Sequence, residues 1–129
     1  MRARTGMAHV FVVDDDPVVC RLAQYVLERA GYSVDVFYDG EDALAALERG
    51  RPNVVVTDLM MPRMNGLSLL HRIRANVAWS ALPVIIFTAR SEAHELQQAE
   101  EAGANQFLSK PFSSAQLLDA VRRFASPTT

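Results

Sequence analysis

The chain has 129 residues, of which 50% are hydrophobic and 22% are charged, and its formal net charge is −2. These values describe one globular domain with a sizeable apolar core, and the single cysteine, Cys20, excludes an internal disulfide. The slightly acidic balance argues against direct nucleic-acid binding, and the short apolar runs exclude a membrane span or signal peptide, so we expect a cytoplasmic protein.

Five short apolar runs are candidate strands, and they alternate with helical patterns along the chain. Three of the runs are almost continuous valine, isoleucine or phenylalanine, which is typical of strands buried on both faces of a parallel sheet. The predicted strands are His9–Val13, Ser33–Phe37, Asn53–Thr57, Pro83–Phe87 and Asn105–Ser109.

A helical pattern follows each predicted strand. The first helix has Asp16 as its N-cap and ends at Gly31, and the second opens at Asp39-Gly40. The other three are marked by Leu67, Leu70 and Ile73, by a polar segment from about Ser91 to Ala102, and by Leu117, Leu118, Val121 and Phe124 after Ser113 or Ser114. The pattern predicts an α/β fold, a (βα)5 doubly wound parallel sheet with helices on both faces.

Polar residues follow four of the predicted strands. In an open parallel sheet, ligands bind at the carboxyl ends of the strands, so these residues are candidates for a shared site. Asp14, Asp15 and Asp16 follow the first strand, Asp58 the third, Thr88 the fourth and Lys110 the fifth.

This combination of side chains suits phosphoryl transfer. Crowded carboxylates repel one another and favour a bound cation, and hard oxygen ligands suit Mg²⁺. A carboxylate can act as a nucleophile and form an aspartyl-phosphate, while Lys110 and Thr88 supply an ammonium and a hydroxyl for the phosphoryl oxygens. Lys110 is also the one lysine among 13 basic residues.

Taken singly, each residue has a simpler structural interpretation. Asp58 could be the N-cap of the next helix, and Asp16 fits that role directly because a proline follows it. Thr88 could bond the backbone at a strand end, and Lys110 could be a solvated surface residue. The joint pattern at four strand ends favours a functional site.

The motifs at these strand ends resemble the receiver domains of bacterial response regulators, of the chemotaxis-regulator type. The segments that carry the resemblance are VVDDDP (12–17), TDLMMPRMNGL (57–67), VIIFTAR (84–90) and FLSKPF (107–112). The resemblance implies a flavodoxin-like sheet with strand order 2-1-3-4-5. It covers residues 8–125, which leaves residues 1–7 as an N-terminal extension and 126–129 as a C-terminal tail.

The resemblance also implies a role for each matching residue. Asp58 corresponds to the phosphoacceptor, and Thr88 and Phe107 correspond to the switch pair. Mg²⁺, with Mn²⁺ able to substitute, would be held by Asp14, Asp15, Asp58 and the backbone carbonyl of Met60. Lys110 would contact the phosphoryl group and precede a cis peptide bond to Pro111. Met60 and Arg90 occupy the positions that tune phosphoryl lifetime, and their bulk predicts slow autodephosphorylation.

The partners implied are a sensor histidine kinase or histidine phosphotransfer protein, which we expect to dock around Val18–Leu22, and a downstream effector. Phosphorylation would remodel the face formed by the fourth helix, fifth strand and fifth helix. The protein would then be a signalling switch that catalyses its own phosphorylation and autodephosphorylation. No effector pattern follows Phe124, so we expect a stand-alone receiver or one excised from a longer regulator or hybrid kinase.

Three alternatives compete with this interpretation. A haloacid-dehalogenase-like phosphatase would place a second aspartate two residues after the nucleophile, where this chain has Met60. A flavodoxin-like cofactor binder needs a phosphate loop after the first strand, where Asp14–Asp16 would repel a phosphate. The third alternative is a receiver-like interaction module that is never phosphorylated.

Overall fold

Strands and helices alternate strictly along the chain in the computed structural model, which describes residues 7–61, 63–89 and 92–127. The predicted order of elements is therefore confirmed. The elements are β1 (His9–Val13), α1 (Pro17–Arg29), β2 (Ser33–Phe37), α2 (Gly40–Arg49), β3 (Val54–Asp58), α3 (Gly66–Ala75), β4 (Val84–Thr88), α4 (Ala93–Glu101), β5 (Gln106–Ser109) and α5 (Ser114–Arg122).

The five strands form one parallel sheet in the order β2-β1-β3-β4-β5, so the predicted order is confirmed. The register pairs Val13 of β1 with Thr57 of β3, and Asp58 of β3 with Phe87 of β4. The carboxyl ends of these strands therefore lie together at one edge of the sheet. The strand order reverses between β1 and β3, which is where open α/β sheets bind ligands.

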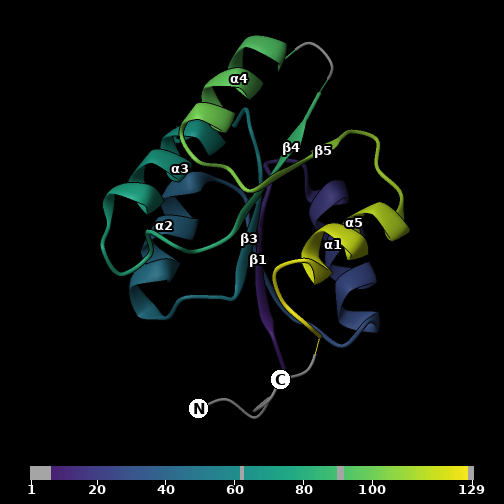
Figure 1. The fold of residues 1–129 in the computed structure, drawn as a ribbon. Helices are drawn as coiled ribbons and strands as arrows, with labels where there is room; N and C mark the ends of the chain where they lie inside the picture. Colours follow the sequence, from purple (N-terminus) through teal and green to yellow (C-terminus); the bar gives the residue numbers. More distant parts are fainter. Residues whose placement is uncertain (1–6, 62, 90–91, 128–129) are drawn as a thin grey trace.

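Helices cover both faces of the sheet: α1 and α5 lie on one side, and α2, α3 and α4 lie on the other (Figure 1). Side chains alternate between the two faces along a strand. In β1, Val10 and Val12 pack toward α1 and α5, whereas Phe11 and Val13 pack toward the opposite helices. Both layers are apolar and buried, which accounts for the continuous hydrophobic runs in the sequence.

Two strands are shifted by one residue from the predicted ranges. β3 was expected at 53–57 and β4 at 83–87, but they extend through Asp58 and Thr88. Parallel pairing continues to these residues because the backbone N–H of Leu59 donates to Phe87 and that of Lys110 donates to Thr88. Asp58 and Thr88 are thus the last residues of their strands, rather than the first residues of the loops that follow.

Side-chain caps fix the starts of the helices that face the same edge. The Asp16 carboxylate accepts a hydrogen bond from the Val18 backbone N–H, as the sequence predicted for α1. Asp39 begins α2 in the same way, also as predicted, and Ser113 forms a reciprocal capping box with Gln116 at α5.

Within residues 7–61, 63–89 and 92–127, no helix is long and apolar enough to cross a membrane.

Candidate functional site

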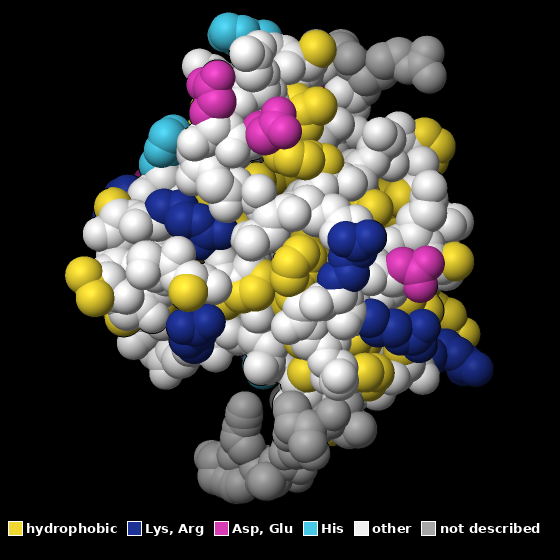
Figure 2. Space-filling view, viewed as in Figure 1, with side chains coloured by type: hydrophobic (Ala, Val, Ile, Leu, Met, Phe, Trp, Pro, Cys, Tyr) yellow, Lys and Arg dark blue, Asp and Glu magenta, His cyan; other side chains and the backbone are white. Residues whose placement is uncertain are grey.

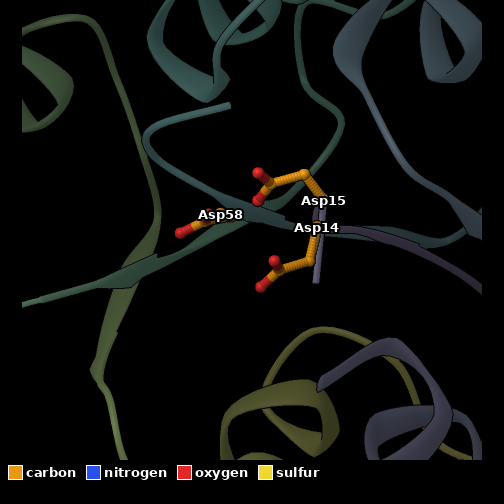
Figure 3. Close-up of side chains that lie close together, drawn as sticks. All are labelled: Asp14, Asp15 and Asp58. Carbon is orange, nitrogen blue, oxygen red and sulfur yellow. The ribbon is translucent and has the colours of Figure 1, made fainter. Parts of the chain in front are cut away.

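Three carboxylates meet at the carboxyl edge of the sheet (Figure 3). Asp14 and Asp15 follow β1, Asp58 ends β3, and one oxygen from each lies within 4.8 Å of the others. Asp14 is fully buried, Asp58 is 7% exposed, and Asp15 faces solvent. The aspartates that the sequence singled out after two different strands are therefore one cluster, with two members inside the protein and one at its surface.

Lys110 brings a positive charge to this cluster from the end of β5. Its Nζ lies 2.8 Å from Oδ2 of Asp14 and 3.2 Å from Oδ1 of Asp58. The peptide bond between Lys110 and Pro111 is cis. One ammonium group thus contacts two buried carboxylates, so a single positive charge is shared between two negative charges.

The electrostatics of the cluster follow from burial and from this sharing. Burial is the main cause that raises the pKa of Asp58 to about 6, and the nearby charge of Asp14 adds to it; Lys110 offsets part of the effect. Burial also raises the pKa of Asp14. For Lys110, burial acts to lower the pKa, but its contacts with the two carboxylates outweigh burial and raise it.

Thr88 and Phe107 lie on β4 and β5, the two strands that follow β3 across the sheet. Thr88 is 6% exposed and ends β4, next to Ser109 of β5. Phe107 is partly buried and packs against the apolar layer on the α2, α3 and α4 side. The proposed switch pair therefore occupies adjacent strands, with the threonine at the edge that carries the carboxylates and the aromatic ring two residues further from that edge.

Met60 and Arg90 are the two residues expected to tune the lifetime of the phosphoryl group. Met60, in the loop after β3, has 45% of its surface exposed. Arg90 lies outside the described residues.

Several contacts at the site were not anticipated from the sequence. The Glu92 carboxylate accepts a hydrogen bond from the Ala89 backbone N–H (2.8 Å), and its charge contributes to the raised pKa of Asp58. Cys20 is buried, and its thiol donates to the Asp14 carbonyl oxygen (3.1 Å). A Glu four residues after a strand-end Thr is the signal that could have identified Glu92, but many helices begin with an acidic residue.

The donor set of the cluster fits a hard divalent cation. The three carboxylates supply oxygen ligands, which Mg²⁺ prefers, and Asp15 leaves one side open to water. Two buried carboxylates that share one lysine also carry excess negative charge, while burial is the main cause of their raised pKa values. A bound dication would compensate that charge.

Comparison with known proteins assigns this arrangement to a family. A model described as "Response regulator receiver domain" matches residues 10–122. The chain belongs to the response regulator receiver domain family. Response regulators act in two-component systems, where they receive signals from histidine kinases and act on effector domains. The family is one of signalling switches, which favours this interpretation over the phosphatase and the flavodoxin-like cofactor binder.

Relatives of this receiver domain occur alone and within longer proteins. Protein PilG of Pseudomonas aeruginosa is 34% identical over 122 residues, which is 95% of this chain and 90% of PilG. Transcriptional regulatory protein CseB of Streptomyces avermitilis is 38% identical over 114 residues, 88% of this chain and 47% of CseB. The chain thus spans about half the length of CseB and several other curated relatives.

Solved structures share the fold of this receiver domain. A putative response regulator from Chloroflexus aurantiacus superposes with a TM-score of 0.87 at 31% identity, covering 92% of this chain and 97% of that one. Chemotaxis protein CheY4 of Vibrio cholerae gives a TM-score of 0.86 at 30% identity, covering 92% and 99%. The flavodoxin-like fold expected from the motifs is confirmed.

Proposed function

We propose that Asp58 accepts a phosphoryl group from the phosphohistidine of a sensor kinase or histidine phosphotransfer protein. An Asp58 carboxylate oxygen attacks phosphorus, the N–P bond breaks, and the histidine nitrogen leaves with the bond's electron pair and gains a proton. The observation that carries this proposal is the position of Asp58, beside Asp14, Asp15 and Lys110 at the switch point of the sheet.

The surrounding residues have complementary roles in the proposed reaction. Asp14, Asp15, Asp58 and the Met60 carbonyl would hold Mg²⁺ or Mn²⁺, which neutralises negative charge on the transferring oxygens when bound. Lys110, already within 3.2 Å of Asp58, stabilises the added phosphoryl charge. Thr88 donates its hydroxyl to a phosphoryl oxygen from the neighbouring strand.

Phosphorylation then changes the face formed by α4, β5 and α5. The Thr88 hydroxyl moves toward the phosphoryl group, and the Phe107 ring turns inward behind it, so that a local charge change biases a two-state element. On the face in Figure 2, two acidic side chains lie toward α4 at the top, basic side chains lie lower on both the left and the right, and an acidic side chain lies among the basic ones at the right. This mixed surface is where a downstream effector protein or domain would dock.

The phosphodonor protein would approach along α1. Val18 and Leu22 expose 64% and 52% of their surface, and Leu22 lines a shallow apolar hollow of about 340 Å³ with Lys110, Pro111 and Phe112. Exposed apolar side chains next to the acceptor site suit a helical partner that delivers its histidine to Asp58.

We further propose that the phosphoryl group is held for a long time. We expect the bulk of Met60, and that of Arg90, which lies outside the described residues, to limit the approach of water to the acyl phosphate. A phosphoprotein that decays as fast as those of the chemotaxis type would contradict this proposal.

The direct test is incubation with acetyl phosphate and Mg²⁺, followed by intact-mass and peptide mass spectrometry. We expect one phosphoryl group on Asp58 in the wild type and none in Asp58→Ala. The never-phosphorylated alternative predicts no modification of either protein. Modification of both proteins would place the acceptor elsewhere.

A further inference from the structure

Both ends of the loop between β3 and α3, the 59–65 loop, of which residue 62 lies outside the described residues, lie against the proposed acceptor. The Leu59 backbone N–H donates to Oδ1 of Asp58 (3.0 Å). The Gly66 N–H donates to the Leu59 carbonyl (2.8 Å), and a Cβ on Gly66 would lie 2.1 Å from the Asp58 carbonyl oxygen. The conformation of this loop and the orientation of the Asp58 carboxylate are therefore coupled.

The middle of the loop rests on the first turn of α2. The Gly40 backbone N–H donates to the Met64 carbonyl oxygen at 3.1 Å. The approach is close enough that a Cβ at Gly40 would lie 2.6 Å from that oxygen. The loop and α2 thus meet through backbone atoms, at a distance that a side chain at residue 40 would prevent.

A charged contact lies beside this backbone contact. The Arg63 guanidinium bonds the carboxylate of Asp39, the N-cap of α2, and its Nε lies 3.8 Å from a Glu41 oxygen. Asp39 is buried, and its other oxygen accepts the Asp42 backbone N–H (2.9 Å). The pair therefore connects the loop after the acceptor to the cap of a different helix.

The backbone of Arg63 supports a role for this pair. Its φ is +62°, in the left-handed region that glycine and asparagine adopt more readily than arginine. The strain of an arginine in this conformation is offset when its side chain makes a contact that holds it there.

We propose that Arg63 is a positioning residue that, by binding Asp39, holds the 59–65 loop in the geometry required for cation binding beside Asp58. The loop carries the Met60 carbonyl, so this inference rests on the proposed function for the identity of the cation site. It adds a residue that contacts neither the phosphoryl group nor the cation.

The competing interpretation is an ordinary surface ion pair. Arg63 has 57% of its side chain exposed, and exposed pairs contribute little to stability. Such a pair would have a small effect on the free energy of unfolding and none on cation affinity. The two interpretations therefore differ in Mg²⁺ affinity, which a purely structural contact would not change.

Two substitutions remove the pair from opposite sides. Arg63→Asn removes the guanidinium but suits the left-handed backbone, and Asp39→Asn keeps a capping oxygen because asparagine caps helices as well as aspartate does. Arg63→Lys retains a positive charge. Arg72→Gln, on the exposed side of α3, is the matched control for loss of one arginine charge.

The measurements are amide hydrogen exchange at Gly40 and the Mg²⁺ dissociation constant from an NMR titration. We expect both Asn variants to speed Gly40 exchange and to weaken Mg²⁺ binding by roughly fivefold, as for loss of a charged hydrogen bond with one buried partner. The double variant should be no weaker than either single variant, because both remove one interaction. Arg63→Lys should recover part of the affinity, and Arg72→Gln should match the wild type.

Unchanged Mg²⁺ affinity in both Asn variants would overturn the inference, as would unchanged exchange at Gly40. Failure of the proposed function gives a different result. In that case wild type lacks phosphorylation at Asp58, while the effect of the two variants on Mg²⁺ affinity is still measurable at the carboxylate cluster. Additive losses in the double variant would also count against the inference, because independent effects would then explain the data.

Discussion

Asp39 and Asp58 expose the same small fraction of their surface, 7% each, yet their pKa values shift in opposite directions. Burial is the largest influence on both and acts to raise the pKa of each. At Asp39, the hydrogen bond from the Asp42 backbone N–H and the Arg63 charge outweigh burial, so the pKa falls below its usual value. At Asp58 it prevails, and the pKa rises to about 6.

The difference lies in depth and in neighbouring charge: Asp58 is enclosed much more deeply than Asp39 and has Asp14 beside it. Asp39 accepts a hydrogen bond from the Asp42 backbone N–H and pairs with Arg63. Asp58 shares Lys110 with Asp14, whose negative charge lies beside it. Asp58 also accepts the Leu59 backbone N–H, so the higher pKa of Asp58 follows from its deeper burial and from the Asp14 charge, which a bound cation would compensate.

Replacing Lys110, whose ammonium contacts both Asp14 and Asp58, should have the largest effect on stability. In Mg²⁺-free buffer at pH 8, Lys110→Met should lower the free energy of unfolding by about 3 kcal/mol, because two buried carboxylates lose their partner. The loss should be smaller at pH 5, where Asp58 is mostly protonated. Urea denaturation at both pH values measures this, with Lys110→Arg as the charge-conserving control. An equal loss of unfolding free energy at both pH values would show that the effect of Lys110 does not depend on the charge of Asp58.

Removing the Asp58 charge should have the opposite effect. Because the folded-state pKa of about 6 exceeds the unfolded value of 3.8, the stabilisation present below pH 3.8 is lost as the pH rises through about 6. Asp58→Asn has no such loss, so it should be more stable than wild type by about 2 kcal/mol at pH 8 in Mg²⁺-free buffer. The two proteins should converge near pH 4, and a pH-independent difference would contradict the prediction.

Asp39 should show the reverse dependence. Its lowered pKa means that its stabilisation is present above the unfolded value of 3.8 and is lost as the pH falls through the folded value. Asp39→Ala should therefore cost about 1 kcal/mol at pH 7, through loss of the cap and the ion pair. The difference from wild type should shrink in acid. Asp39→Asn, which keeps the cap, should cost less, and denaturation curves for the two variants would separate the contributions.

The smallest expected effect concerns Glu92. Its charge contributes to the raised pKa of Asp58, so Glu92→Gln should move the midpoint of Asp58 titration slightly below 6 while keeping an acceptor for the Ala89 N–H. Carbon-13 NMR of the Asp58 carboxyl group measures the midpoint, with Glu95→Gln as a control about one turn further along. An unchanged midpoint would exclude Glu92 from the electrostatics of the site.

Local patterns in the sequence predicted most of the scaffold. Apolar runs and helix caps identified the ten elements and their order, because strand burial and capping depend on residues close together in the chain. The ends of β3 and β4 were displaced by one residue, because pairing with the neighbouring strand extends through Asp58 and Thr88. Strand pairing is a property of two segments, and one segment cannot specify it.

The sequence by itself determined which chemical groups reach the carboxyl edge of the sheet, since residues at the ends of parallel strands must meet there. The sequence did not determine which positively charged side chain pairs with each carboxylate. That one lysine serves both Asp14 and Asp58, whereas Arg63 pairs with Asp39 from 24 residues away, was decided by tertiary packing. The reason is physical: a carboxylate's pKa depends on burial and on the charges within a few ångströms, and both are set when distant segments fold together.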